Sequence, residues 1–155
     1  MSVQGATSYS NIHGAGFKGQ VADANDALIS SALAEGDIPT GVACVRGTAD
    51  SRGVKVPTAG GIFEGVAVRN LHQLEDATTN VLEIQDGHEV PLLRRGDVFV
   101  ELDETVAVDD PVYFADVGGL FGNDATARTL IVGARFLDGG VVGDIVRIRI
   151  PSAVA

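Results

Sequence analysis

The amino-acid sequence predicts an all-β protein, either a small β-barrel or a jelly-roll-like sandwich, with an extended N-terminal arm. The first observation is a period-two alternation within residues 92–114, which is typical of half-buried antiparallel strands. The second is the regular spacing of roughly eight short apolar runs, each bounded by turn residues. The third is the composition, because 20 glycines, no tryptophan and one methionine suit short strands joined by tight turns.

Length and charge limit the organisation and the partners. At 155 residues the chain is expected to form one domain, residues 21–155, preceded by an arm, residues 1–20. The net charge of −10 argues against binding to nucleic-acid phosphates, which needs clustered lysine and arginine. We expect no secretion signal, because the N-terminal residues show no basic region followed by an apolar core, and no apolar run approaches the roughly 20 residues of a membrane helix. We therefore expect a protein made in a cytoplasm, without a nucleic-acid or membrane partner.

The arm, residues 1–20, is rich in Gly, Ser, Asn and Gln, and such a segment cannot build a core of its own. Its larger apolar side chains stand singly, at Tyr9, Ile12 and Phe17. Two interpretations remain open. The segment is a frayed tail, or it becomes ordered on a partner that offers pockets for these three side chains.

The stretch that follows the arm is ambiguous. Residues 24–34 fit a short helix capped by Asn25 or Asp26, but their apolar residues make a poor helical stripe. We favour an extended or irregular segment with a bulge at Ser30 and Ser31.

Residues 38–47 are predicted to form a strand that begins through Pro39 and ends at Gly47. Cys44 lies in the apolar run of this strand, and as the one cysteine of the chain it has no intramolecular disulfide partner. A buried, inert thiol is expected there. The polar, Gly-rich residues 48–61 are expected to be a surface loop.

The rest of the chain alternates between apolar runs and turn signals. Within the central stretch, Val106 and Val108 resume the period-two pattern and Asp109-Asp110-Pro111 breaks it. Before the central stretch we expect a strand at 62–68, a loop at 71–79, a short strand at 80–84 and a turn at Asp86-Gly87. Strands follow within 92–114 and end on the run 112–114. After them we expect a hairpin-like bend at 118–123, a strand at 130–137, a turn at 138–140 and a final strand at 145–150.

The core is expected to form around the central stretch, because one face of its alternation is apolar. The opposite face carries Phe99, Glu101 and Asp103. The side chains predicted to face inward are Val98, Val100, Leu102, Ile148 and Ile150.

Short motifs that resemble known sites have simpler explanations. Residues 14–19 lack the Gly-Lys-Ser/Thr order of a phosphate-binding loop. The tripeptide Arg95-Gly96-Asp97 matches an adhesion motif, but a turn explains it better. The histidines are scattered without metal-ligand spacing, at His13, His72 and His88.

Carboxylates gather near the central stretch, where Asp109 and Asp110 precede a proline. Glu101, Asp103 and Glu104 lie close by in sequence. Such groups can bind calcium or serve in acid–base catalysis. Because these three lie among core residues of one strand, we expect a solvated outer face instead. No Ser/His/Asp or Cys/His set can be assembled, so we expect no enzyme, no cofactor and no metal.

The order of segments along the chain resembles that of the structural cement, or decoration, proteins of tailed-bacteriophage heads. The residues that carry the resemblance are the Gly/Asn-rich arm, Gly19-Gln20-Val21-Ala22-Asp23, Ala34-Glu35-Gly36-Asp37-Ile38-Pro39, Gly41-Val42-Ala43-Cys44-Val45-Arg46-Gly47, Gly61-Ile62-Phe63-Glu64-Gly65-Val66-Ala67, Val90-Pro91-Leu92-Leu93-Arg94-Arg95-Gly96 and Gly143-Asp144-Ile145-Val146-Arg147-Ile148.

The resemblance implies a non-enzymatic virion protein, made in the bacterial host cytoplasm and carried on the capsid exterior. In that family the β domain sits outside the icosahedral head and extended segments clamp neighbouring major capsid protein subunits. The capsid-binding residues would then be the arm positions Tyr9, Ile12 and Phe17.

Two further expectations concern partners. A β domain with open edge strands is expected to pair with copies of itself as a dimer or trimer, because unpaired edges need cover. The alternative function is a free-standing β-fold binding module, for instance for carbohydrate. That alternative needs exposed aromatic side chains, whereas aromatic residues make up 5% of the chain and tryptophan is absent.

Overall fold

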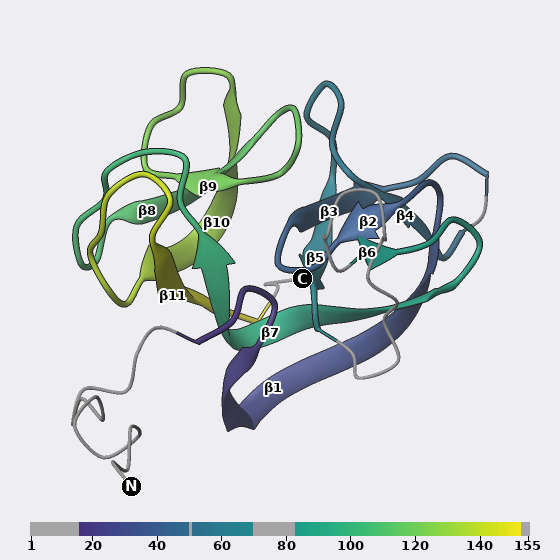
Figure 1. Cartoon of the computed structure of the whole chain (residues 1–155), viewed down its shortest axis with the longest axis horizontal. Helices are drawn as coiled ribbons and strands as arrows, with labels where there is room; N and C mark the ends of the chain where they lie inside the picture. Colours follow the sequence, from purple (N-terminus) through teal and green to yellow (C-terminus); the bar gives the residue numbers. More distant parts are fainter. Residues whose placement is uncertain (1–15, 50, 70–82, 153–155) are drawn as a thin grey trace, which may run out of the picture.

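The computed structural model describes residues 16–49, 51–69 and 83–152. Within these ranges the chain forms eleven strands and no helix, so the predicted all-β class is confirmed (Figure 1). Accordingly, this part of the protein offers no helix that could cross a membrane. The strands are β1 (Val21–Ala34), β2 (Ile38–Pro39), β3 (Ala43–Arg46), β4 (Gly53–Lys55), β5 (Phe63–Ala67), β6 (Glu83–Ile84), β7 (Glu89–Glu101), β8 (Pro111–Ala115), β9 (Phe121–Gly122), β10 (Arg128–Phe136) and β11 (Ile145–Ile150).

Five strands close into a first ring. β1, β4, β3, β5 and β7 pair in that order, and β1 also pairs with β7, which closes the ring. The β1–β4 pairing is parallel and the other four are antiparallel. A separate ladder of β2 with β6 brings Ile38 and Ile84 into the core of this ring.

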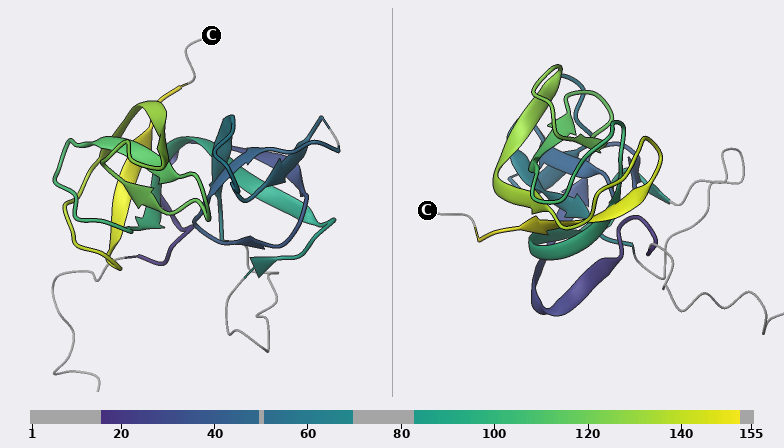
Figure 2. Two further views of the ribbon diagram at one scale, coloured as in Figure 1. Left: turned by 90° about the horizontal axis from the view of Figure 1, so that it is seen from above. Right: turned by 90° about the vertical axis from the view of Figure 1, so that its left-hand side faces the viewer.

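A second ring shares β7 with the first. From β7 the sheet continues through β11, β10 and β8 to β9. Leu102, directly after β7, then forms a parallel bridge to Phe121 of β9 and closes this ring. Figures 1 and 2 show β8 to β11 as one lobe and β2 to β6 as the other, with β7 running through both. Closed pairing of this kind favours the barrel over the sandwich among the predicted architectures.

The change of ring takes place inside β7. β5 pairs with Leu92 and Leu93, whereas β11 pairs with residues 96–101. At Gly96 the backbone has φ 123°, and a Cβ there would lie 3.0 Å from the Cα of Ala27 in β1. The turn predicted at Arg95-Gly96-Asp97 is therefore wrong. This glycine lets a long strand bend under the close approach of β1.

The core has two parts. The first ring is filled by small and branched side chains that surround Cys44 and Leu92. The larger cluster fills the second ring with Phe114 and Phe136, and it also includes Val45 and Leu93 from strands of the first ring. Apolar packing is thus continuous across the junction. The five residues predicted to face inward are all buried: Val98, Val100, Leu102, Ile148 and Ile150.

β1 is extended, as favoured from the sequence, but its irregularity lies elsewhere than predicted. The register with β7 shifts three times between Val21 and Ile29. Ser30 and Ser31 instead pair regularly with β7, so the bulge predicted at these serines is wrong. The shifts leave residues 24–27 as an excursion beside Gly96, whose lack of a side chain leaves room for them.

Two further expectations in the first half need correction. The strand predicted at 38–47 is interrupted over residues 40–42, which separate β2 from β3. The segment 48–61 is not loop throughout, because it contains β4, where Val54 is buried. A strand of three residues is too short to show alternation in sequence. The strand at 62–68 is confirmed as β5.

In the second half most expectations hold. The turn at Asp86-Gly87, the bend that leads into β9, and β8, β10 and β11 lie where predicted. The loop predicted at 71–79 lies outside the described residues, and only the end of the strand predicted at 80–84 is described, as β6. Val106 is buried and bridges Gly140, but Val108 is exposed in a turn beside Asp109, which has φ 69°. The alternation therefore ends at Val106, two residues earlier than predicted.

The single cysteine has the environment expected from its sequence context. Cys44 is fully buried on β3. Burial raises the pKa of its thiol to about 12, although a backbone hydrogen bond with Ala67 acts in the opposite direction. A thiol held in the neutral form is a poor nucleophile, so Cys44 serves as a small core residue.

Candidate functional site

The end of the arm is fixed to the strand that both rings share. The Gly19 amide donates a hydrogen bond of 2.8 Å to the carbonyl of Phe99, and the Phe99 amide donates one of 3.0 Å to the carbonyl of Gln20. The Arg69 amide donates to the carbonyl of Gly19 at 2.8 Å. Residues 16–20 of the predicted arm thus lie on the body of the protein, and they set the point from which the preceding residues depart.

Two glycines allow this close approach of main chains. Gly19 has φ 83° and Gly41 has φ 76°, both in the region that favours glycine. A Cβ on Gly41 would lie 2.7 Å from the Gly19 amide nitrogen and 2.7 Å from the Cβ of Lys18. Any side chain at Gly41 would therefore push the arm off the first ring.

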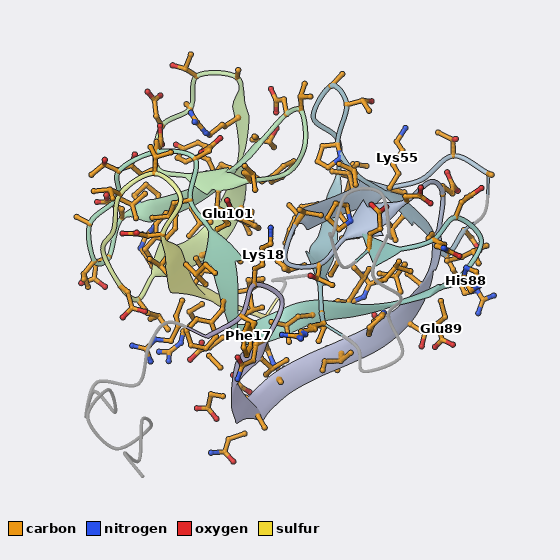
Figure 3. All side chains as sticks on the ribbon, viewed as in Figure 1. Phe17, Lys18, Lys55, His88, Glu89 and Glu101 are labelled. Atoms are coloured by element: carbon orange, nitrogen blue, oxygen red, sulfur yellow. The ribbon has the colours of Figure 1, made fainter. Side chains whose placement is uncertain are left out.

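Of the three predicted anchors, the structure describes one. Phe17 is 65% exposed, and the Arg69 guanidinium carbon lies 4.5 Å from the centroid of its ring. The next residue, Lys18, reaches Glu101 with a separation of 2.9 Å between nitrogen and oxygen (Figure 3). Phe17 is thus held at the surface by a cation–π contact and by its neighbour's ion pair. Tyr9 and Ile12 lie outside the described residues.

A groove lies at the junction of the two lobes, beside the last described residues. Ile150, Pro151 and Ser152 line it, and in both views of Figure 2 this end of the chain lies opposite the start of the described chain. Its volume is about 670 Å³. The other lining residues come from β3, β5, β7, β10 and their ends: Arg46, Ile62, Phe63, Glu64, Arg94, Leu130, Ile131, Val132 and Gly133.

A carboxylate shared by two arginines lies in this groove. Glu64 is 2.7 Å from Arg46 through one carboxylate oxygen and 2.7 Å from Arg94 through the other. Burial raises the pKa of Glu64, but hydrogen bonds from Arg94 and Arg46 outweigh burial and hold that pKa below its ordinary value. The Glu64 side chain is 12% exposed and the Arg46 side chain 58%, so the guanidinium faces outward above the carboxylate.

This cluster makes stability depend on pH. Because the pKa of Glu64 is lower in the folded state, its contribution is complete above the ordinary carboxyl pKa of about 4.3. The contribution is lost as the pH falls through the lower, folded value. We therefore expect Glu64→Gln to destabilise the protein at pH 7, with a gap to the wild type that narrows toward pH 3. Urea unfolding across this range measures the gap, and an equal gap at both ends would contradict the assignment.

The other polar groups singled out in the sequence are structural. Asp103 and Glu104 are partly buried and both pair with Arg128, which corrects the predicted solvated face. Asp110 accepts hydrogen bonds from the Ala107 amide and from Asn123, and these lower its pKa. In the described ranges no three His, Cys, Asp or Glu residues are placed to hold a metal ion. His88 is exposed, while His13 and His72 lie outside these ranges.

Several residues of the candidate site were missed in the sequence. Lys18 meets Glu101, and Arg69 meets Phe17, only because segments distant in sequence are brought together beside β7, and nothing local signals this. Ile62, Leu130 and Val132 were assigned to strands, but the side chains that face the groove are exposed, by 60%, 42% and 81%. A carbohydrate-binding module needs exposed aromatic side chains. Among the large apolar residues that the structure describes, Phe17 is the only exposed aromatic one.

Comparison with known proteins adds the following findings. Residues 5–151 match a family described as structural cement protein (E217 gp24/Pam3 gp6). Among curated proteins, none matches the chain. A chain in the capsid of Myoviridae phage XM1 shares the fold, with a TM-score of 0.72 and 14% identity over 96% of this chain and 98% of that chain. The head fiber gp8.5 N base of bacteriophage phi29 aligns with a TM-score of 0.48 and 12% identity over 83% of this chain and 98% of that chain.

Proposed function

Because this chain belongs to the structural cement protein family, we propose that it binds the outside of an icosahedral phage head and ties neighbouring major capsid protein subunits together. Its role as a structural protein of the virion follows from the family itself. The observation that carries the proposal is the extent of the match, which begins at residue 5 and ends at residue 151. It includes most of the arm as well as both rings, so the arm is a feature of the family.

A cement protein of this kind needs no chemistry beyond binding. A protein that binds the assembled shell, but not free subunits, stabilises the shell by mass action. Many equivalent sites on one head add avidity without new kinds of contact. The buried Cys44, the paired carboxylates and the closed rings suit a rigid body that presents surfaces, and we propose that it has no catalytic activity.

The arm is proposed to supply part of this binding. Residues 16–20 are held on β7 and aim the arm from a fixed point. Tyr9 and Ile12, together with the exposed Phe17, then provide single apolar side chains for pockets between capsid subunits. The small residues between them allow the main chain to lie flat against a capsid strand, as in strand addition.

Self-association on the head, as a dimer or trimer, is a further part of the proposal. Open sheet edges motivated it, but β1 pairs with both β4 and β7, and β9 is bridged by Leu102. Support therefore comes from avidity alone, because copies that contact each other share the entropic cost of docking. Equilibrium sedimentation of the free protein and counting of copies per head distinguish the states.

The test uses heads assembled without this protein. We expect the purified chain to co-sediment with such heads, to saturate at a fixed number of copies and to raise the temperature at which the heads break open. Protease added to intact, loaded heads should reach the bound chain from outside. Protein that stays in the supernatant at saturating heads would contradict the proposal, and protein reached only after the heads are opened would contradict its exterior position.

A further inference from the structure

We propose that the groove at the junction of the two lobes binds one extended segment of a capsid subunit, which adds as a strand between β5 and β10 and places a carboxylate near Arg46. The inference rests on the proposed function and names a second contact besides the arm. Three features of the groove carry it: its open strand edges, its exposed apolar wall and its charge.

The groove is bordered by strand edges. Residues 130–133 of the β10 region and residues 62–64 at the start of β5 line it as consecutive runs. Within the run 130–133 the exposed Leu130 and Val132 alternate with the buried Ile131, so the strand pairings, and not the lining residues, identify the edge. In the described pairings, β10 meets β11 only at Arg135 and Phe136, and β5 meets β7 only at Val66 and Ala67.

These edges stand out because the rest of the sheet is closed. In both rings the strands have neighbours on each side, through the β1–β7 pairing and the Leu102–Phe121 bridge. The junction, where β5 and β10 diverge from their neighbours, is the place where main-chain groups remain for an added strand. Pro151 lies beside Gly133 and has no amide hydrogen, so the ladder from β11 cannot extend into this gap.

The wall of the groove is apolar and exposed. Val132 is 81% exposed, Ile62 60% and Leu130 42%. Isolated exposed apolar side chains are ordinary, but these three face one hollow from two lobes. An extended segment with apolar side chains on one face would bury all three at once.

The charge of the groove selects the occupant. One carboxylate, Glu64, is shared by Arg46 and Arg94, which leaves one net positive charge in a chain whose net charge is −10. Arg46 is the outer member, so a carboxylate on the incoming segment can pair with it without displacing Glu64. Repulsion between two chains of net charge −10 works against a second copy as the occupant of this groove, so the proposed self-association on the head uses another surface. A capsid segment with apolar residues and one acidic residue fits better.

The experiment compares matched variants for binding to heads assembled without this protein. Val132→Asp places a negative charge on the apolar wall, and Val117→Asp makes the same change at a valine that is 73% exposed outside the groove. We expect Val132→Asp to weaken head binding at least tenfold and Val117→Asp to change it less than twofold. Arg46→Glu should also weaken binding at least tenfold. Urea unfolding midpoints identify any variant that fails to fold.

Hydrogen exchange tests strand addition directly. The amides of residues 130–133 and 62–64 should gain protection when the wild-type protein is bound to heads, while those of β11 stay unchanged. If Val132→Asp and Val117→Asp both bind heads as tightly as the wild-type protein does, the inference is overturned and the proposed function is left intact. Failure of the wild type to bind would count against the function itself. A soluble oligomer that Val132→Asp dissociates would assign the groove to a second copy and overturn the inference.

Discussion

Truncation of Leu102 to alanine should lower the free energy of unfolding by about 2–5 kcal/mol. Leu102 is 1% exposed and lies in the larger core cluster. Its main chain also closes the second ring, through the bridge to Phe121 and a 3.0 Å hydrogen bond from its amide to the carbonyl of Asp144. The substitution leaves a cavity at the point where the ring is joined, and the surrounding strands cannot collapse into it without opening the bridge.

Urea unfolding measures this loss, as a lower midpoint with an unchanged slope. Val108→Ala is the matched control, because Val108 is 58% exposed and its truncation should cost less than about 0.5 kcal/mol. A loss below about 1 kcal/mol for Leu102→Ala would show that the Leu102 side chain is exposed and that the register of this face is off by one residue.

Deletion of residues 2–14 should weaken binding to heads by more than tenfold, or about 1.4 kcal/mol. The same deletion should leave the unfolding midpoint of the free protein nearly unchanged. The deletion stops before Gly16 because residues 16–20 are bonded to Phe99 and Arg69 and belong to the folded body. Ordering a segment costs on the order of 1–2 kcal/mol per residue, so the arm can contribute to binding only where Tyr9 and Ile12 meet pockets.

A variant that keeps the full length of the arm distinguishes contacts made by the arm's apolar side chains from simple tethering by its main chain. Replacement of Tyr9 and Ile12 by serine keeps the arm but removes its apolar side chains, and it should weaken binding nearly as much as the deletion. Co-sedimentation with heads measures both variants. If the deleted protein binds as tightly as the full chain, the arm is only a tail and the remaining contact surfaces, the groove among them, carry the binding. A large fall in the unfolding midpoint would place the arm within the fold.

The parts of the fold that sequence predicts well are those with a local signal. β11 has the predicted bounds because Ile148 and Ile150 alternate with arginines and Pro151 ends the run. The inward face of β7 follows from the same period of two. β4 was missed because three residues in a polar segment show no period. The turn predicted around Gly96 was wrong because a glycine that allows a bend in a strand looks in sequence like one that allows a turn.

The site was less predictable than the fold. The arm was visible as a change in composition, and Phe17 was among its proposed anchors. The groove was not visible, because Ile62 and Val132 have the composition of core strands and only the divergence of β5 and β10 exposes them. Closure of both rings depends on the pairing of β7 with β1, β5 and β11. The sequence of β7 does not indicate which segments it pairs with.

The shared strand also determines when the protein can fold. Val21 pairs with Val98, and Leu33 pairs with Glu89, so β1 has to wait for most of the chain before its β7 partner exists. On the ribosome the first ring cannot close until β7 has emerged, although every other strand of that ring precedes it. Contacts between residues so distant in sequence make folding slow, on the order of milliseconds to seconds. The strand that joins the two lobes therefore also limits the rate of folding, and until it has been synthesised the edge of β1 that pairs with β7 is open to other nascent chains.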